Sequence, residues 1–383
     1  MHNSVRNFPW MLIFCALSLL AAGLCGIQES EKLVASSGRM FRQQVLWAAL
    51  AISVAAAAAY PQYAVMRRWA YAGFAASLFL LVAVYWFPAV NGSHRWIRIG
   101  PIGLQPSELA KLFFIAALAR WLMYRNEQRR LVGWVVPLLL AVLPAALVLR
   151  EPDLGTALLF FPVLMAVMLA AGVRWSHLAM LLLSGLMLLP AFWSLMSREQ
   201  VSRVTAVLQQ TGPGENPDDD GFHLHHAKRL VALGGTAGID NRHDEAIAAV
   251  HYVPAAATDS IFVVLAARFG LLGVAVLLGL YFVLLQQMLS IALRTGEPFA
   301  RLFVVGVAAL LASQVVTNTA MMVGLLPITG LALPLVSYGG SGLVANGLAV
   351  GLVINIALRP HIGVRGEPFR VVASTTATSQ AAA

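Results

Sequence analysis

Long apolar segments constrain the fold of this chain more than any other feature of its sequence. A membrane-crossing helix needs roughly 20 mainly apolar residues, because backbone groups in hydrocarbon must be hydrogen-bonded within their own segment. The chain has 383 residues, of which 59% are hydrophobic and only 11% are charged. We therefore expect an all-α polytopic membrane protein with about ten transmembrane helices, near residues 9–27, 45–66, 71–90, 108–124, 132–149, 153–173, 177–196, 260–290, 301–325 and 342–358.

The distribution of charge predicts the orientation of these helices. With the N-terminus inside, the cytoplasmic segments hold 13 Lys and Arg against 3 Asp and Glu. The external segments and external helix ends hold 13 basic residues against 14 acidic ones. Cytoplasmic loops of membrane proteins are rich in Lys and Arg, so both termini are expected in the cytoplasm. The net charge of +9 then reflects topology, and we expect no nucleic-acid partner.

One polar segment, residues 197–258, separates the seventh and eighth expected helices on the outer side. It carries the turn-rich acidic run "TGPGENPDDDGFHLHHAK", whose histidines match no defined metal-ligand spacing. Long loops inside compact folds are usually functional or disordered. We expect one polytopic membrane domain over residues 1–365, including this extracytoplasmic loop, and a flexible cytoplasmic tail over residues 366–383.

The stretch "NGSHRWIRIGPIGLQPSELAKLFF" places charged residues at the outer end of the third and fourth helices. Pro106 suits the first position of a helix, and Glu108 then lies in its first turn. Glu108 and Lys111 are three residues apart, so they share a helix face and can pair. The stretch is consistent with a helix start whose lysine extends outward. It is also consistent with a cationic pocket in which Arg95 and Arg98 bind an anionic lipid headgroup.

The stretch "LREPDLGTALLF" forms a very short external turn between two expected helices. It brings Asp153 next to Arg150 and Glu151, and Pro152 can begin the following helix. A turn that only starts a helix and a turn that contributes a binding site explain this pattern about equally well.

The stretch "LPITGLALPLVSYGGSGLVANGLAV" is apolar, yet prolines and glycines interrupt it. Broken backbone at membrane depth is tolerated where it is buried in protein or lines a cavity. Ser337 and Tyr338 would supply polar groups to such a cavity. A structural re-entrant hairpin with close glycine packing is the alternative.

The stretch "VPAAATDSIFVV" carries a single carboxylate, Asp259, where the external loop enters the eighth helix. Thr258, Asp259 and Ser260 are all favourable helix-starting residues, so Asp259 can act as a cap. A positioned carboxylate can also act as a general base. Local sequence alone does not choose between these two roles.

Taken together, the motifs of residues 45–358 resemble the SEDS (shape, elongation, division and sporulation) family of RodA/FtsW-type peptidoglycan glycosyltransferases, as a divergent member. Five motifs carry the resemblance and follow one another in the family's order: "NGSHRWIRIGPIGLQPSELAK", "EPDLGTA", "DDDGFHLHHAKRLVALGG", "ATDSIFVVLAARFGLLG" and "LLPITGLALPLVSYGGSGL".

This resemblance implies a multi-pass protein of the bacterial cytoplasmic (inner) membrane with its active site on the outer face. It implies polymerisation of lipid II, the undecaprenyl-diphosphate-linked muropeptide, into glycan strands during elongation or division. It also implies a class B penicillin-binding protein transpeptidase as partner. A flippase or transporter for lipid-linked precursors, or a non-catalytic division scaffold, is the alternative function.

The resemblance also implies roles for individual residues. Asp259 would be the general base that takes the proton of the acceptor hydroxyl, which contributes on the order of 10²–10⁴-fold. Cationic side chains would stabilise the departing diphosphate. A divalent cation (Mg²⁺ or Mn²⁺) can share that role, although the sequence shows no dedicated protein cage and no other cofactor. The expected substrate-binding residues are Arg95, Arg98, Gln105, Ser107, Glu108, Lys111, Asp153, Ser337 and Tyr338.

Three departures from the family pattern lie near Asp259. Residues 255–257 are all alanine where family members commonly have Glu and His. Ala267 and Arg268 stand where acidic residues are common, and "GTAGIDNRHDEA" replaces the usual Gly-rich end of the loop. We therefore expect Asp259 to lack acidic neighbours from its own segment, which weakens the case for a raised pKa.

Overall fold

The computed structural model describes residues 8–33, 38–88, 93–100, 102–123, 131–176, 179–180, 182–183, 198–209, 220–239 and 256–359. Within these ranges the regular structure is helical apart from one antiparallel hairpin, β1 (Ile97–Ile99) and β2 (Ile102–Leu104). The helices are α2 (Trp10–Leu33), α3 (Arg39–Ala59), α4 (Ala64–Ala83), η1 (Val84–Trp86), α5 (Pro106–Leu122), η3 (Leu131–Trp134), α6 (Val135–Arg150), α7 (Leu154–Ala170), α9 (Arg198–Gln209), α10 (Asp220–Leu233), α12 (Ile261–Arg294), α13 (Pro298–Met322) and α14 (Gly340–Leu358).

The expected all-α membrane architecture is confirmed. Among the described residues, six helices (α2, α3, α4, α12, α13 and α14) are long and apolar enough to cross a membrane. The apolar helices α6 and α7 are shorter. The count of ten remains a prediction, because most of the expected seventh helix (177–196) lies outside the described residues, as does the tail (366–383).

The boundary between the second and third expected helices is corrected by the structure. The sequence predicted helices over 45–66 and 71–90, whereas α3 ends at Ala59 and α4 begins at Ala64. Pro61 lies in the turn between them, and a proline lacks the N–H that would continue a helix. The amide of Asn355 donates to the carbonyl oxygens of Ala58 (2.7 Å) and Pro61, which ties this turn to the end of α14.

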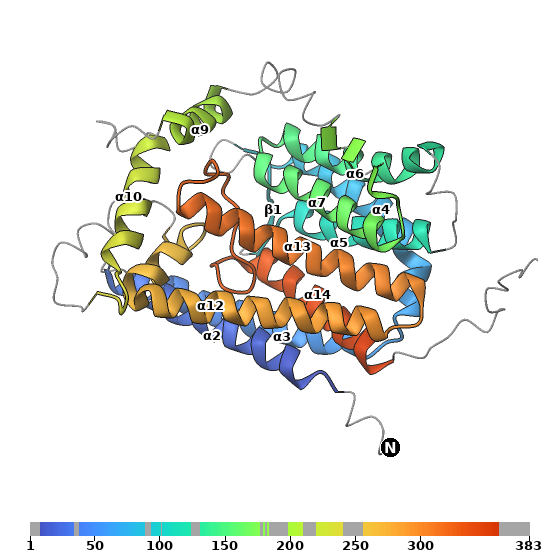
Figure 1. The fold of residues 1–383 in the computed structure, drawn as a ribbon, viewed down its shortest axis with the longest axis horizontal. Coiled ribbons are helices and arrows are strands. Elements are labelled where there is room, and N and C mark those ends of the chain that lie inside the picture. Colours follow the sequence, from blue (N-terminus) through green and yellow to red (C-terminus); the bar gives the residue numbers. More distant parts are fainter. Residues whose placement is uncertain are drawn as a thin grey trace, which may run out of the picture.

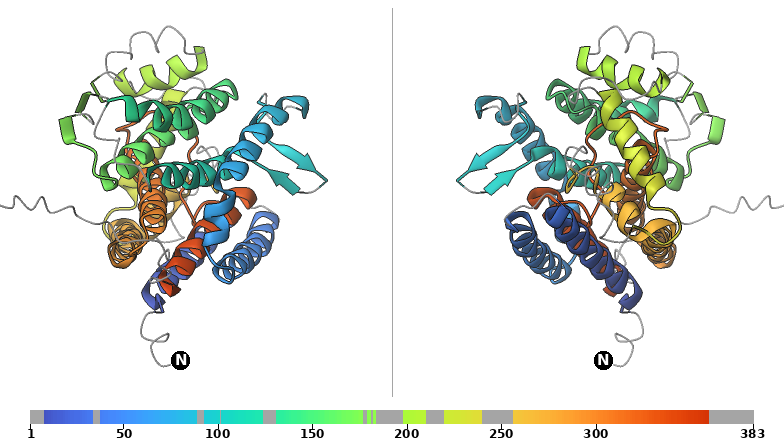
Figure 2. Two further views of the ribbon diagram at one scale, coloured as in Figure 1. Left: turned by 90° about the vertical axis from the view of Figure 1, so that its right-hand side faces the viewer. Right: turned by 90° about the vertical axis from the view of Figure 1, so that its left-hand side faces the viewer.

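The long helices lie side by side, with α9 and α10 at one end of the molecule (Figure 1). Helix α3 packs closely along α14. A Cβ atom added to Gly351 would lie 2.4 Å from the carbonyl oxygen of Ala55, and one on Gly347 would lie 2.6 Å from that of Ala51. Small residues therefore bring these two helices into direct backbone contact. Figure 2 shows the β1–β2 hairpin projecting from the helical body.

Helix α12 is interrupted at Gly270, whose φ of 64° is a backbone conformation that favours glycine. Residues 234–239, which follow α10, lie against this break. The carbonyl of Gly235 accepts from Leu271 N (2.9 Å), and Ile239 N donates to the Ala267 carbonyl (2.9 Å). The break thus supplies backbone hydrogen-bonding groups that hold residues 234–239 beside α12.

Arg268, which stands where family members commonly have an acidic residue, also helps to hold residues 234–239 in place. Its Nε lies 3.2 Å from a carboxylate oxygen of Glu29 on α2. Its Nη1 donates to the carbonyl oxygen of Ile239 (3.0 Å). Arg268 therefore connects α2, α12 and residues 234–239.

Candidate active site

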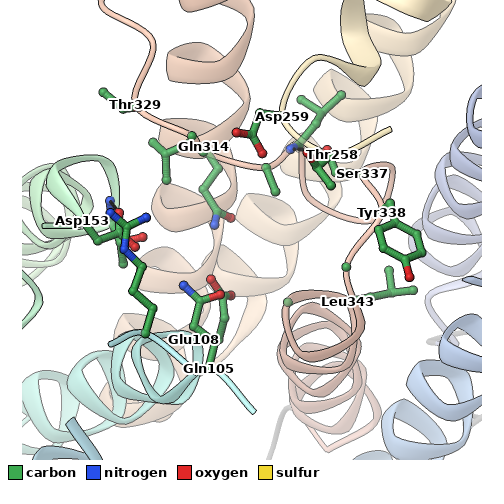
Figure 3. A pocket seen from close by; sticks show the side chains of 18 of the residues that line it. Gln105, Glu108, Asp153, Thr258, Asp259, Gln314, Thr329, Ser337, Tyr338 and Leu343 are labelled. Atoms are coloured by element: carbon green, nitrogen blue, oxygen red, sulfur yellow. Dashed lines mark hydrogen bonds between the residues drawn. The ribbon is translucent and has the colours of Figure 1, made fainter. Parts of the chain in front are cut away.

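A polar cavity of about 490 Å³, here called the central cavity, opens among the helix ends (Figure 3). Its walls come from the starts of α5, α7 and α14, from α9 and α13, from the turn 256–260, and from the non-helical segment 329–339. The polar residues that line it are Ser93, Arg95, Gln105, Glu108, Asp153, Thr156, Arg203, Thr258, Asp259, Gln314, Thr329, Ser337, Tyr338 and Asn346.

A single buried amide connects the turn that carries Asp259 with the non-helical segment. Asn318, on α13 and 0% exposed, donates from Nδ2 to the carbonyl oxygens of Asp259 (2.8 Å) and Leu331 (2.7 Å). The backbone N–H of Tyr338 donates to the Ala257 carbonyl (2.9 Å), which adds a second connection. These bonds satisfy carbonyl groups of two irregular segments that lie inside the helical bundle.

The Asp259 side chain points into the central cavity (Figure 3). Burial raises its pKa, the hydrogen bond from Thr258 lowers it, and the charge of Asp153 raises it again. Arg203 and Arg95 lower it further. The expectation that Asp259 lacks acidic neighbours holds only for its own segment, because folding brings Asp153 near it from α7.

Asp153 and Arg95 are held in place by backbone contacts around the 151–153 turn. Asp153 Oδ1 accepts from Thr156 N (3.1 Å), so Asp153 caps α7, which begins at Leu154 and not at Pro152. Arg95 Nε donates to the Glu151 carbonyl (2.9 Å), and its Nη2 donates to the Pro152 carbonyl. One edge of the guanidinium is thus fixed to the turn.

The start of α5 has the arrangement that its sequence predicts. Pro106 lies in the first helical positions, and Lys111 Nζ contacts Glu108 Oε1 at 2.8 Å. Glu108 and Gln105 reach the central cavity, whereas Ser107 and Lys111 are buried and do not line it. Lys111 acts on the cavity through its pairing with Glu108.

Of the other expected binding residues, two line the central cavity and one does not. Ser337 and Tyr338 line the central cavity, with Ser337 Oγ accepting from Leu333 N (2.8 Å) and Tyr338 Oη donating to Gln43 (2.7 Å). Arg98 is exposed on β1 and does not line the cavity. Its position gives no support for direct contact with a ligand in this cavity.

Sequence reasoning missed several cavity residues. Arg203 reaches the cavity from α9, a helix that was not expected within the polar segment 197–258. Gln314 and Asn346 line the cavity from α13 and α14. Asn318 holds the turn that carries Asp259 by a hydrogen bond to its carbonyl. Amide side chains inside membrane-spanning segments are costly unless they are partnered, and this signal was available in the sequence.

The described residues do not form a metal cage of their own. Among them, no three His, Cys, Asp or Glu side chains lie together as potential ligands. Of the three carboxylates in the central cavity, Glu108 pairs with Lys111 and Asp153 caps α7, and the three come from separate elements.

Fold and cavity define a class: a multi-pass α-helical membrane protein with a polar cavity that holds both carboxylates and guanidinium groups. Residues 6–361 match the family described as cell cycle proteins, which comprises FtsW, RodA and SpoVE. The chain belongs to this family.

Known relatives cover nearly the whole chain. The probable peptidoglycan glycosyltransferase FtsW of Trichlorobacter lovleyi is 31% identical over 366 residues, covering 92% of this chain and 94% of the relative. The peptidoglycan glycosyltransferase MrdB of Escherichia coli K12 is 32% identical over 356 residues, covering 92% and 94%. A solved structure described as "Structural coordination of polymerization and crosslinking by a peptidoglycan synthase complex" matches with a TM-score of 0.79 and 32% identity, covering 92% of this chain and 98% of that one.

Replacing Asn318 by leucine should loosen the two segments that it connects. Each buried carbonyl left without a donor costs about 1–3 kcal/mol. In hydrogen–deuterium exchange, the amides of residues 256–260 and 331–338 should then exchange faster.

Asn355→Leu is the matched control, because Asn355 also bridges two carbonyls but at the other end of α14. It should lower the thermal unfolding midpoint without changing exchange at residues 256–260. Equal exchange at these residues in both variants would contradict the role given to Asn318.

Glu151 should make stability depend on pH. It is 1% exposed, and neither carboxyl oxygen has a hydrogen-bond partner among the described residues. Its pKa is raised from 4.5 to about 8, chiefly by burial and also by the charge of Asp153, while Arg95 acts in the opposite direction. The folded state therefore holds this proton more tightly than the unfolded chain, and stability falls as pH rises from about 5 to 8.

Glu151→Gln removes the titrating group, so its unfolding midpoint should change less across this pH range than that of the wild-type protein. The comparison is made by thermal scanning in detergent from pH 5 to 8.5. Parallel pH profiles for the two proteins would show that Glu151 is not responsible.

Proposed function

We propose that this protein is a peptidoglycan glycosyltransferase that polymerises lipid II into glycan strands for cell-wall synthesis. The observation that carries the proposal is the placement of Asp259 in a polar cavity that also holds Arg95 and Arg203. The membership of the family and the names of its relatives support the same activity.

Asp259 is the proposed general base. In this reaction the acceptor sugar hydroxyl bonds to the anomeric carbon of the donor while the bond from that carbon to the diphosphate breaks. The hydroxyl proton passes to the Asp259 carboxylate as the new bond forms. Attack from the face opposite the leaving group inverts the configuration of the anomeric carbon.

Arg95 and Arg203 are the proposed partners of the departing diphosphate. Negative charge grows on this group as its bond to the sugar breaks, and guanidinium donors stabilise phosphate oxygens well. Arg95 is already oriented by two backbone carbonyls, so it loses little freedom when it binds. Arg203 comes from the external helix α9. A divalent cation bound to the diphosphate of the substrate would supply further positive charge to stabilise this leaving group.

The remaining expected residues that line the central cavity are the proposed contacts for the sugars and the peptide. They are Gln105, Glu108, Asp153, Ser337 and Tyr338. Carboxylates, amides and hydroxyls bind polyhydroxylated ligands through hydrogen bonds. Their positions on helix starts and short turns hold them in fixed directions around the cavity.

The setting of the reaction follows from the same proposal. The central cavity would face the outer side of the bacterial cytoplasmic membrane, with both termini in the cytoplasm, as the charge distribution predicts. The proposed partner is a class B penicillin-binding protein, which would cross-link the strands. The relative described as a peptidoglycan synthase complex supports a partner of this kind.

Asp259→Asn should abolish polymerisation while leaving substrate binding nearly intact. The amide keeps the size of the side chain but cannot accept the proton, so the rate of glycosyl transfer should fall by about 10²–10⁴-fold. The measurement is single-turnover transfer with labelled lipid II in detergent, with binding measured separately on the same preparation.

A variant that binds lipid II and polymerises it at the wild-type rate would sink the assignment of Asp259. Loss of both binding and transfer would point to a fault in folding. The variant Asp259→Glu then tests the base role separately, because it retains a carboxylate. Activity in Asp259→Glu together with inactivity in Asp259→Asn supports the base role, and activity in neither contradicts it.

A further inference from the structure

A second space lies beside the central cavity and differs from it in chemistry. This groove, of about 380 Å³, is formed by α2, α3 and α14 and is lined almost entirely by apolar side chains. Figure 2 shows these three helices next to one another on one side of the body. Leu17 and Ile52, each 46% exposed, lie at its rim, so the groove opens toward the lipid-facing surface.

The floor of the groove depends on the close packing of α3 against α14. Gly347 lines the groove, and at this glycine and at Gly351 the two helices meet through their backbones. Helix α2 forms the opposite wall and packs against the non-helical segment at Gly23, where a Cβ would lie 2.4 Å from the Val336 carbonyl. The groove is therefore part of the packed structure and not a gap between loosely associated helices.

The groove and the central cavity meet at Leu335. This residue lines both spaces and is 4% exposed. Its φ of 66° is rare for a side-chain-bearing residue. On α14 the two spaces also adjoin, because Asn346 lines the cavity and Gly347 lines the groove. The polar cavity and the apolar groove therefore share Leu335 as a lining residue.

We propose that this groove binds the polyprenyl chain of the lipid-linked substrate whose diphosphate and sugars occupy the central cavity. The inference rests on the proposed function, because that function supplies a ligand with a polar head and a long apolar tail. Leu335 lies where head and tail join, and Ala56, Ile52 and Leu17 contact the tail.

The position of the groove favours a polyprenyl chain over an acyl chain that enters from the cavity end. Groove residues on α14 run from Gly347 to Leu358, about 16 Å at 1.5 Å per residue, in the half of the helix away from the cavity. One leaflet of hydrocarbon is about 15 Å thick, so an acyl chain whose headgroup lies at the cavity end reaches only to the start of the groove. An undecaprenyl chain is much longer and extends through it.

Two neighbouring alanines on α3 provide a matched test. Ala56 and Ala57 are both exposed on the same helix, but only Ala56 lines the groove. Ala56→Trp should fill the groove without disturbing the α3–α14 contact, whereas Ala57→Trp should point into lipid. The full chain, reconstituted in phospholipid nanodiscs, is given undecaprenyl diphosphate with a photoreactive diazirine on its chain, or geranyl diphosphate as the short-chain probe.

In the wild-type protein and Ala57→Trp, the long probe should label residues of α2, α3 and α14 despite excess phospholipid. In Ala56→Trp its binding should weaken by about tenfold, through lost contact with roughly two methylene groups. Geranyl diphosphate should bind all three proteins equally, which shows that the cavity is intact. Equal binding of the long probe by both tryptophan variants, or labelling outside these helices, would overturn the proposal.

Polymerisation of lipid II, measured on the same preparations, separates this proposal from the proposed function. Labelling of the groove without any glycan product would contradict the glycosyltransferase assignment and leave the chain-binding site standing. If both tryptophan variants synthesise glycan at equal rates and bind the long probe equally, the chain-binding role of the groove is contradicted and the glycosyltransferase assignment stands.

Discussion

The site depends on the two hydrogen bonds that the Asn318 amide makes. Asp259 and Leu331 lie in irregular segments at the ends of α12 and α13, and neither segment has a helix to satisfy its backbone. In a bilayer such carbonyls need a donor from the protein itself. One buried amide supplies both bonds, so the position of the proposed catalytic carboxylate is set by α13, a helix whose sequence is otherwise mainly apolar.

The same requirement explains why the cavity lies where it does. Irregular backbone is tolerated at membrane depth only inside the bundle or around a cavity. The segment between α13 and α14 meets this condition by contacting the Asp259 turn on one side and α3 on the other, where Gln44 donates to the Ser337 carbonyl (3.1 Å). Ala255, where family members commonly have an acidic residue, lies outside the described residues. Ala256 and Ala257, the second of which stands where family members commonly have histidine, are buried beside this segment, and the Ala257 carbonyl accepts from Tyr338 N. Their small size fits a position where backbone meets backbone.

Much of this arrangement could be predicted from the sequence, because it is local. The pairing of Glu108 with Lys111 follows from three-residue spacing on a helix, and Pro106 marks the start of that helix. The non-helical conformation of residues 329–339 follows from the prolines and glycines that interrupt this stretch. What remained hidden depends on contacts between distant segments. Arg203 reaches the cavity only through the placement of α9, and Asp153 acts on Asp259 only because folding brings the starts of α7 and α12 to the same cavity. Arg98 looked equivalent to Arg95 in sequence, but Arg98 is exposed on β1, whereas Arg95 precedes this strand and is held by the carbonyls of Glu151 and Pro152.

The central cavity is the proposed site of glycosidic bond formation, and the apolar groove is the proposed binding site for the lipid tail. Sealed vesicles containing the protein, with labelled lipid II added only on the cavity side, test the role of the central cavity most directly. The account predicts muramidase-sensitive glycan strands on the side of addition, without movement of the lipid across the bilayer. Transfer of labelled lipid II to the opposite leaflet with no strand formed would contradict it and favour a transporter.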